Sequence, residues 1–238
     1  MHRFYTQPEN VHENSLIIEG DEAKHIKNVL RMQTGDEFIV FDGTGYDYGC
    51  RIKSVGAQIE AQVLSKELNK TEPGIKLTLY QAYPKSAKME DIVQKAIELG
   101  VFRIVPFIAH RCVKRPEDSS RLRRVALAAV KQCGRSLLPS VEDVLRFDDA
   151  LELMKTHDKL IVCWEEERGT TLKQALAGDA KDIGVVIGPE GGLEESEVRR
   201  MRDAGGVSAT LGPRIMRTET AGIAVLAAIF YDKGQMQL

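Results

Sequence analysis

The segment Gly184-Val185-Val186-Ile187-Gly188-Pro189-Glu190-Gly191-Gly192 decides the fold class. Its short apolar run predicts a buried strand, and the polar residues from Glu194 to Ala204 predict a helix after the loop. In open α/β sheets, ligands bind at the carboxyl ends of the strands. Glycine there permits positive φ angles and lets backbone groups approach a ligand without an intervening Cβ atom. A lone glycine pair would indicate only a connecting turn, whereas this longer glycine-rich loop indicates a binding site.

The loop lacks the known phosphate-binding motifs. It contains neither G-x-x-x-x-G-K-[ST], which holds nucleoside triphosphates, nor the G-x-G-x-x-G fingerprint of dinucleotide-binding domains. Gly43, Gly45 and Gly49 miss that fingerprint by one residue and lie between predicted strands, where they indicate a hairpin turn. A nicotinamide-dependent oxidoreductase is therefore a poor alternative.

Around this loop the chain alternates between strands and helices. This order predicts an α/β domain with a mostly parallel sheet and helices on both faces. One helix is predicted from Ser86, a candidate N-cap, to Leu99, with Gly100 ending it. The apolar run from Ala221 to Tyr231 is about half as long as a membrane-spanning helix and predicts a buried helix instead. The predicted strands are Ile75–Tyr83, Phe102–Ile108, Lys159–Trp164, Ile183–Ile187 and Ser208–Leu211.

The first 72 residues have a different pattern, in which short strand-like runs separated by glycine turns predict a small barrel. One helix is expected within them, from Asp21 as a candidate N-cap to Arg31. The polar segment from Asn69 to Gly74 contains Pro and Gly and is the predicted linker, which gives domains of residues 1–72 and 73–238. The predicted strands are Ser15–Glu19, Glu37–Asp42, Tyr46–Lys53 and Ala57–Ser65, and the helix carries Ala23, Ile26, Val29 and Leu30 on its apolar face and Lys24, Lys27 and Arg31 opposite.

The composition is that of a globular protein, with 43% hydrophobic and 29% charged residues. The N-terminus has no apolar stretch of the kind that a secretory signal requires. The four cysteines form neither a C-x-x-C pair nor a zinc-ligand spacing and the five histidines are scattered, so we expect free thiols in a reducing cytosol and no metal. The net charge of −2 hides a basic segment from Arg111 to Arg135, with eight Lys or Arg residues against two acids. That segment predicts an RNA phosphate-binding surface, an amphipathic helix with a solvated face, or both at once.

A second unusual loop, from Leu211 to Ala221, leads into the apolar C-terminal helix. Thr218 or Thr220 is the expected N-cap of that helix. The loop also carries two arginines and a carboxylate, which fit either a helix cap with solvated charges or a functional site. The residues alone leave both interpretations open; the charged residues are Arg214, Arg217 and Glu219.

The glycine loop Gly188-Pro189-Glu190-Gly191-Gly192 is thus followed by Leu211-Gly212-Pro213-Arg214-Ile215-Met216-Arg217-Thr218-Glu219-Thr220-Ala221. This pair resembles the signatures of the RsmE family of 16S rRNA uracil-N3 methyltransferases, in the SPOUT or trefoil-knot superfamily. Met216 stands where leucine is more usual, and Val125 follows Arg124 where an aromatic residue would be expected. The similarity extends over the whole chain, through His2-Arg3-Phe4, Asp36-Glu37, Phe41-Asp42-Gly43, the run from Gln94 to Val101, and Gln132, Gly134, Arg135 and Pro139.

The resemblance implies an α/β fold, with an N-terminal PUA-like β-barrel for RNA and a C-terminal SPOUT domain that has a parallel sheet and a trefoil knot. It implies S-adenosyl-L-methionine as the cofactor, bent among backbone groups of the two loops. Either Glu190 or Glu219 is available to face the sulfonium charge. The implied cofactor-binding residues are Gly188, Pro189, Glu190, Gly191, Gly192, Leu211, Gly212, Arg214, Ile215, Met216, Thr218, Thr220 and Ala221.

Methylation of uracil N3 requires loss of the imide proton from a base that is unpaired or flipped out. Arg217 is then expected to stabilise the uracil anion, while Glu219 orders the loop or accepts the proton. The implied partner is 16S rRNA or the small ribosomal subunit in the cytoplasm, with no membrane. The apolar run from Ile223 to Phe230 would be half exposed on a monomer, which predicts a homodimer. The predicted RNA-binding residues are Arg3, Lys24, Lys27, Arg31, Lys85, Lys88, Arg111, Arg121, Arg123, Arg124 and Arg135.

Two alternatives stay open. Another SPOUT enzyme would methylate a ribose 2′-O or guanine N1, although the order of motifs over the whole chain favours uracil N3. A non-catalytic RNA-binding assembly factor would keep the fold, but the intact loops count against it, and cofactor binding would separate the two.

Overall fold

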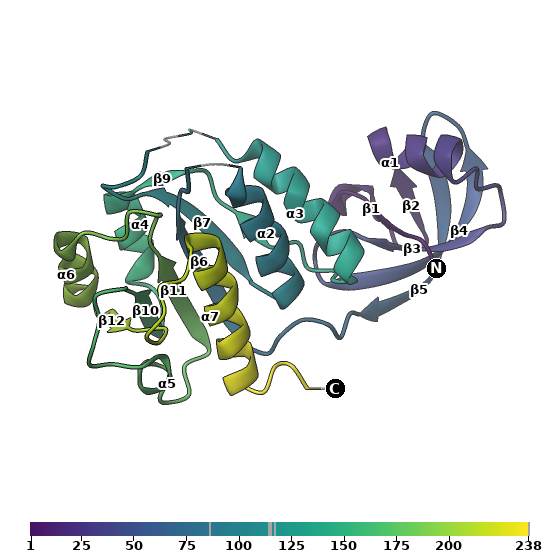
Figure 1. Ribbon diagram of the computed structural model, residues 1–238. Coiled ribbons are helices and arrows are strands. Elements are labelled where there is room, and N and C mark those ends of the chain that lie inside the picture. The colour runs from purple at the N-terminus through teal and green to yellow at the C-terminus, as the bar shows by residue number, and fades with distance from the viewer. Residues whose placement is uncertain (86, 114–115, 117, 238) are drawn as a thin grey trace. The chain divides into compact units, whose positions relative to one another are not determined.

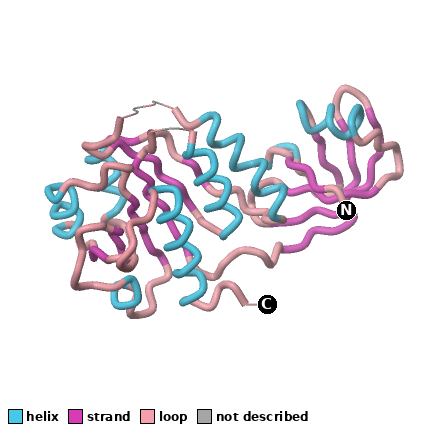
Figure 2. The backbone as a smooth tube through the Cα atoms, in the orientation of Figure 1, coloured by secondary structure: helices cyan, strands magenta, loops and turns pink. Residues whose placement is uncertain are grey.

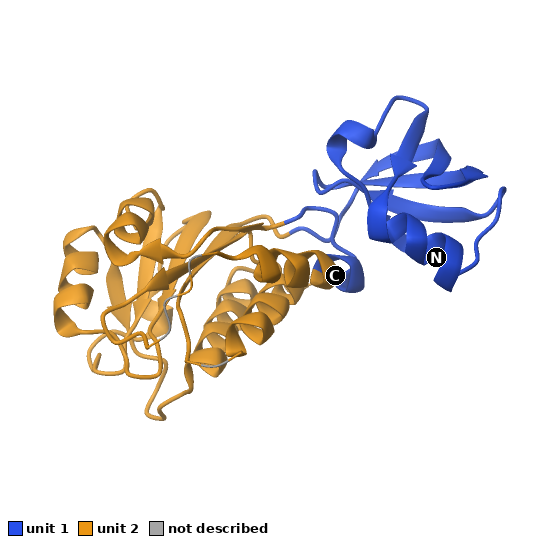
Figure 3. Ribbon diagram, turned by 90° about the horizontal axis from the view of Figure 1, so that it is seen from above, with its two compact units in different colours: residues 1–72, 130–138 blue, residues 73–129, 139–238 orange. Residues whose placement is uncertain are grey.

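The computed structural model describes residues 1–85, 87–113, 116 and 118–237. The chain forms two compact units, which Figure 3 draws in blue and orange. Unit 1 consists of Met1–Glu72 with Val130–Leu138, and unit 2 consists of Pro73–Ala129 with Pro139–Leu238. Chain order alone does not reveal that Val130–Leu138 belongs with the N-terminal residues.

Unit 1 is built on a five-stranded sheet with the strand order β1-β3-β4-β5-β2. β1 runs parallel to β3, and the other neighbours are antiparallel. Side chains from these strands, among them Phe4, Phe38 and Ile59, form a buried core. The expectation of several N-terminal strands is confirmed. The strands are β1 (Arg3–Tyr5), β2 (Ser15–Ile18), β3 (Glu37–Phe41), β4 (Tyr46–Val55) and β5 (Ile59–Leu68), with a short 3₁₀ turn at Pro8–Asn10.

The helix of unit 1 differs from its prediction at both ends. It begins as α1 (Gly20–Lys24) and continues as a π-helical turn over His25–Val29. The N-cap position is Glu19, without a side-chain cap bond, so Asp21 lies inside the helix and does not cap it. A π turn holds more residues than an α turn, which shifts the later side chains around the axis. Val29 is therefore 65% exposed and not on the buried face.

Two arginines attach the segment Val130–Leu138 to the rest of unit 1. Arg135 is only 3% exposed and forms an ion pair of 2.7 Å with Glu72. Arg3 pairs with Asp47 at 2.9 Å and donates to the Ser136 hydroxyl at 2.9 Å. Both side chains hold unit 1 together, which leaves neither of them a free cation for RNA.

Unit 2 contains a seven-stranded sheet with the order β12-β10-β11-β6-β7-β8, and β9 also pairs with β7. Every paired strand runs parallel, which confirms the predicted α/β sheet. The two-residue strands β8 and β9 are additions that no periodicity signals. The strands are β6 (Lys76–Ala82), β7 (Arg103–Ile108), β8 (Ser140–Val141), β9 (Leu145–Arg146), β10 (Lys159–Cys163), β11 (Asp182–Ile187) and β12 (Val207–Ala209).

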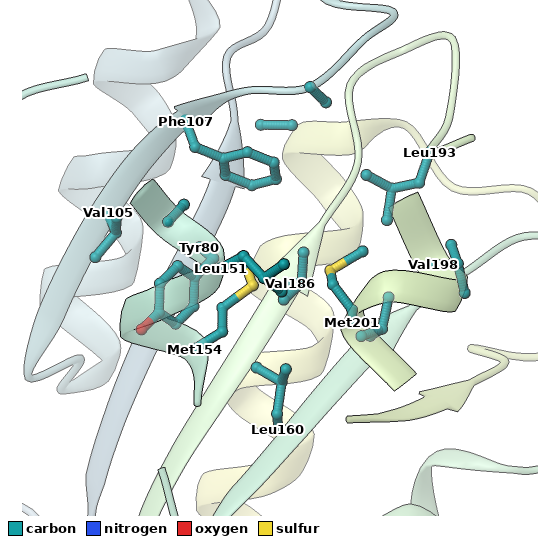
Figure 4. Packing of buried hydrophobic residues seen from close by; sticks show 14 of the residues in the cluster. Tyr80, Val105, Phe107, Leu151, Met154, Leu160, Val186, Leu193, Val198 and Met201 are labelled. Atoms are coloured by element: carbon teal, nitrogen blue, oxygen red, sulfur yellow. The ribbon is translucent and has the colours of Figure 1, made fainter. Parts of the chain in front are cut away.

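Helices cover both faces of this sheet, as predicted. Successive side chains of a strand point to opposite faces, so Tyr80 and Gln81 of β6 face different helices. Tyr80 lies in the core formed with α4 and α6, where Figure 4 shows Leu151 and Met201 among its members. On the Gln81 side, α7 packs against β6 and β11 with α2 beside it (Figures 1 and 2). The helices are α2 (Lys88–Leu99), α3 (Ser120–Cys133), α4 (Phe147–Met154), α5 (Leu172–Ala175), α6 (Glu195–Asp203) and α7 (Thr218–Asp232).

The helix ends confirm some expectations and correct others. Gly100, with φ of 108°, ends α2 as predicted, while the expected cap Ser86 lies outside the described residues. The N-cap position of α7 is Arg217, which makes no side-chain cap bond. Neither Thr218 nor Thr220 caps the helix, because both lie within it. That expectation is wrong, and the hydroxyl of Thr218 is bonded elsewhere.

In the described ranges, no helix is both long and apolar enough to cross a bilayer. The same residues contain no group of three or more His, Cys, Asp and Glu side chains placed to hold a metal ion. All four cysteines are free thiols, as expected, and three of them are buried.

Candidate active site

The two loops singled out in the sequence meet at the carboxyl edge of the sheet. The glycine loop, residues 188–192, follows β11, and the C-terminal loop, residues 210–217, connects β12 to α7. β10 lies between β11 and β12 in the sheet. Together they surround a cavity of about 420 Å³, within the roughly 300–1,000 Å³ typical of small-molecule sites. It is lined by Lys88, Cys163, Trp164, Glu165, Ile187, Gly188, Pro189, Glu190, Gly192, Thr210, Leu211, Gly212, Arg214, Ile215, Met216, Arg217, Thr218 and Ala221.

The glycine loop folds back tightly on itself. A Cβ atom at Gly188 would lie 3.2 Å from the Leu193 nitrogen and 3.3 Å from the Gly192 carbonyl carbon, so a side chain there would force these backbone segments apart. Gly192 has φ of 74°, which L-residues rarely adopt. A Cβ atom at Gly192 would also fall on the Glu165 carboxylate. The glycines therefore allow a closer approach of chain segments than other residues would.

A direct hydrogen bond joins the glycine loop to the start of α7, which directly follows the C-terminal loop. The Thr218 hydroxyl donates to the Gly188 carbonyl at 2.7 Å. Lys88, the first residue of α2, bridges the same segments by charge: its Nζ lies 3.0 Å from Glu219 Oε2 and 3.7 Å from Glu190 Oε1. Glu190 also accepts the backbone N–H of Lys85 at 3.1 Å. The walls of the cavity are thus fixed to each other and to α2.

The environment of Glu219 keeps it ionised. Partial desolvation raises the pKa of Glu219, but its own backbone N–H, the Lys88 hydrogen bond and the charges of Lys88 and Arg217 lower it, and the net shift is downward. A carboxylate with a lowered pKa is a weak proton acceptor near neutral pH. These contacts favour the ordering role over the proton-accepting role expected for Glu219.

The cavity lining suits a cationic nucleoside without phosphates. Ile187, Leu211 and Met216 offer apolar surface, and Glu165 and Glu190 supply carboxylates. Trp164 adds an aromatic wall, and its indole N–H is buried without a hydrogen-bond partner among the described residues. Burial raises the pKa of Cys163 to about 12, which keeps the thiol protonated and unfit as a nucleophile.

Most of the predicted cofactor residues line this cavity together with Arg217, whereas Gly191, Thr220 and Glu219 do not. The Gly191 carbonyl accepts a hydrogen bond from Arg111 Nη1 at 2.9 Å, so Arg111 holds the outer side of the glycine loop. The Glu219 carboxylate pairs with Lys88, which itself lines the cavity. Sequence reasoning missed the residues supplied by β10 and its following loop. They would have been found only with the strand order known; they are Cys163, Trp164 and Glu165.

The predicted RNA-binding residues are spread over both units. Lys24 and Lys27 are exposed on the helix of unit 1, where Lys24 pairs with Asp21, and Arg31 is exposed in the loop just after it. In unit 2, α3 exposes three arginines, two of which form ion pairs with acids. The basic residues at 114 and 115 lie outside the described residues. The three arginines are Arg121, 2.8 Å from Glu90, Arg123, 2.8 Å from Asp143, and Arg124.

Residues 71–230 match the family model of an RNA methyltransferase domain, and residues 18–63 match that of an RNA methyltransferase PUA domain. Ribosomal RNA small subunit methyltransferase E of Bacillus subtilis is 36% identical over 228 residues, which are 90% of this chain and 89% of that protein. The crystal structure of ribosomal RNA small subunit methyltransferase E from Neisseria gonorrhoeae bound to S-adenosylmethionine superimposes with a TM-score of 0.84 at 31% identity, covering 97% of each chain. A methyltransferase from Legionella pneumophila with bound S-adenosylmethionine gives 0.83 at 29% identity, again over 97% of each chain.

Proposed function

The chain belongs to the RNA methyltransferase family whose members include ribosomal RNA small subunit methyltransferase E, and we propose that it transfers the methyl group of S-adenosylmethionine to N3 of a uridine in 16S rRNA. One observation carries this proposal in the structure: the glycine loop and the C-terminal loop enclose one cavity at the carboxyl edge of a parallel sheet. That edge is where such sheets bind ligands. The related protein of Bacillus subtilis is bacterial, and bacterial ribosomal RNA lies in the cytoplasm, so we propose that location for this chain as well.

The two loops, with Trp164 and Glu165, would hold the cofactor through backbone groups, an aromatic wall and carboxylates. When bound, S-adenosylmethionine supplies an electrophilic methyl group on a positively charged sulfur. The enclosure matters because methyl transfer requires the nitrogen, methyl carbon and sulfur to be aligned. The fixed contacts Thr218 to Gly188 and Lys88 to Glu219 pre-organise that enclosure.

Arg217 is the side chain best suited to act on the base. It is exposed and lines the cavity at the start of α7, so its guanidinium can reach a flipped-out uracil. Loss of the N3 proton leaves negative charge shared by N3 and the two carbonyl oxygens of the base, which a positioned cation stabilises. Glu219, held ionised by Lys88, orders this turn, and the N3 proton passes to solvent water.

The test is methylation of small-subunit rRNA with purified protein and S-adenosylmethionine, followed by mass spectrometry of the nucleosides. We expect 3-methyluridine. A 2′-O-methylated nucleoside or 1-methylguanosine would assign another acceptor, and unmethylated RNA would overturn the proposal.

Arg217→Ala should lower kcat by about 100-fold, the usual effect of losing one charge-stabilising group, with cofactor affinity unchanged. Arg199→Ala, which removes an exposed arginine on α6, is the matched control.

We expect the functional unit to be a homodimer built on α7. Tyr231 is 77% exposed near the end of this helix, and Ile223, Ala224 and Ala227 remain partly exposed on a helix that is otherwise apolar. Sedimentation velocity should give a dimer for the wild type and a monomer for Tyr231→Asp. A wild-type monomer that is fully active would contradict this expectation.

RNA binding is assigned to the exposed basic residues of both units, without Arg3 and Arg135, whose side chains are engaged inside unit 1. Cations on α3 and on the helix of unit 1 can neutralise phosphates at several points. Phosphate contacts of this kind position the RNA, whereas the cavity selects the base.

A further inference from the structure

A buried hydrogen-bond relay lies directly behind the cavity. Gln81 of β6 is fully buried, and Thr218, the first residue of α7, is 5% exposed. The Gln81 amide nitrogen donates to the Thr218 hydroxyl at 2.9 Å, and this hydroxyl donates to the Gly188 carbonyl at 2.7 Å. The relay therefore connects the central strand, the C-terminal helix and the glycine loop.

The number of available protons fixes the direction of this relay. The Gln81 amide has two hydrogens, and both are used, one for Thr218 and one for the Ala82 carbonyl at 3.0 Å. The opposite amide orientation would place two acceptor oxygens 3.0 Å apart. The Thr218 hydroxyl must accept from Gln81, so its single hydrogen is free only for the Gly188 carbonyl. A side chain that never reaches the cavity thereby decides how the glycine loop is held.

We infer that Gln81 is a positioning residue for the cofactor, which sets the glycine loop by orienting the Thr218 hydroxyl. The inference rests on the proposed function. Gly188 lines the cavity from the glycine loop and Thr218 lines it from the start of α7, whereas Gln81 does not line it. Gln81 lies in β6, which is paired on both sides by β11 and β7, so the relay connects the glycine loop and the start of α7 to the interior of the sheet.

The other atom of the Gln81 amide argues against a purely structural role. Its Oε1 is buried and has no hydrogen-bond partner among the described residues. A Cβ atom at Gly222 would lie 3.4 Å from it, so α7 approaches this oxygen through a residue without a side chain. An unpaired buried oxygen destabilises a fold. An apolar side chain of similar length would remove this penalty but would break the relay.

These features define a set of variants. Gln81→Met removes the relay and the unpaired oxygen together, and Thr218→Val removes the hydroxyl at nearly constant shape. Thr218→Ser is the conservative variant that keeps the hydroxyl. Gln94→Leu removes an amide from an exposed position on α2 and serves as the control.

Calorimetric titration with S-adenosylmethionine should show affinity about tenfold weaker for Gln81→Met and for Thr218→Val, the effect of removing one hydrogen bond. Thr218→Ser should bind within about twofold of the wild type, and Gln94→Leu like the wild type. The double variant Gln81→Met/Thr218→Val should bind no more weakly than either of its single variants, because each substitution breaks the same relay. The melting temperature of Gln81→Met should stay close to that of the wild type.

A folded Gln81→Met that binds as tightly as the wild type, or additive losses in the double variant, would overturn the inference. If the wild type itself bound no S-adenosylmethionine, the proposed function would fail and not the relay. Hydrogen exchange without ligand then decides the relay: backbone amides near residues 188–193 should exchange faster in Gln81→Met and Thr218→Val than in Thr218→Ser. Equal exchange in all three would overturn it as well.

Discussion

The role predicted for Lys88 from its charge differs from the role that its contacts in the structure indicate. The sequence assigns it to RNA phosphates, whereas the structure places its ammonium between Glu219 of α7 and Glu190 of the glycine loop. Its side chain is only 26% exposed and lines the cavity. A lysine in this position stabilises the site before it meets any RNA.

Removing Lys88 should therefore weaken the cofactor site. Lys88→Met leaves two carboxylates without their shared cation, and we expect S-adenosylmethionine affinity to fall about tenfold, as for the removal of a charged hydrogen bond. Glu219→Gln should have a smaller effect. Calorimetry of the single variants and of Lys88→Met/Glu219→Gln checks this, because the double variant should match Lys88→Met. Strict additivity would show that the two side chains act separately.

A second buried polar group lies on the other face of the sheet. The Tyr80 hydroxyl is 2.7 Å from His157 Nε2, and His157 Nδ1 bonds to the Asp182 carboxylate. Tyr80 is fully buried and the His157 side chain is 5% exposed. Gly184 leaves room for the imidazole, because a Cβ atom there would lie 2.7 Å from His157 Cδ2.

His157→Leu should lower the free energy of unfolding by about 2 kcal/mol, since it leaves the Tyr80 hydroxyl buried and unpaired. Urea unfolding measures this change. Adding Tyr80→Phe should recover part of the stability, because removing both partners leaves nothing unsatisfied. A double variant less stable than His157→Leu would mean that the hydroxyl has another function.

Single residues mark the limit of sequence reasoning in this chain. Both loops and Arg217 were identified from composition and resemblance, but the role of Thr218 was not, because a threonine at a helix start is ordinarily a cap. Arg135 was predicted to bind RNA, yet it is buried against Glu72. Periodicity assigns a side chain to a face; it does not reveal which distant residue will meet it.

At the scale of elements, the loop after β10 shows how one carboxylate can order a segment. Glu167 accepts a hydrogen bond from the Ser208 hydroxyl and from the backbone N–H groups of Gly169 and Arg168. It also pairs with Arg202 at 2.8 Å. The hydrogen bond from Ser208, followed by those from the backbone N–H groups of Gly169, Thr170 and Arg168, lowers the pKa of Glu167 from 4.5 to about 2. Trp164 and Glu165, the first two residues of this loop, line the cavity.

Because the pKa of Glu167 is lower in the folded protein, its ionised form stabilises the fold. This contribution is complete above its ordinary pKa of 4.5 and disappears as the pH falls towards about 2. The Tm difference between the wild type and Glu167→Gln should therefore be constant near neutral pH and shrink in acid. Thermal unfolding measured from about pH 7 to about pH 3 checks this. A difference that grows in acid would contradict the assignment.

The arginines of α3 can be tested separately from the cavity. Arg121→Gln and Arg124→Gln together should weaken RNA binding and reduce its salt dependence by about one unit of slope for each phosphate that is no longer neutralised. Cofactor affinity should not change. Arg199→Gln, on α6, is the control for removal of a surface charge. An unchanged salt slope would remove α3 from the RNA-binding surface.

Elements were predictable where their pattern is long. The parallel strands and α2 follow directly from apolar runs and helical spacing, and Gly100 ends α2 as expected. The π turn after α1 was missed because the same residues fit an α-helical face. β8 and β9 are two residues each and exist only through pairing with β7, which no local pattern can signal.

At the scale of the whole molecule, the fold class could be predicted, whereas the membership of residues in its units could not. Val130–Leu138 lies far along the chain from residues 1–72 but belongs with them. The reason is a set of long-range bonds, such as Arg135 to Glu72 and Asn69 to Gly134. Such contacts depend on the completed fold and leave no periodic signal.

The central claim is that the glycine loop and the C-terminal loop form one site for S-adenosylmethionine. Calorimetric titration of the RNA-free protein tests it most directly, with Gly188→Ala as the partner variant, because a Cβ atom there would crowd the backbone of residues 192 and 193. We predict saturable binding at one site per chain for the wild type and affinity at least about tenfold weaker for Gly188→Ala. A folded wild-type protein that takes up no S-adenosylmethionine, or a variant that binds it equally well, would contradict the account.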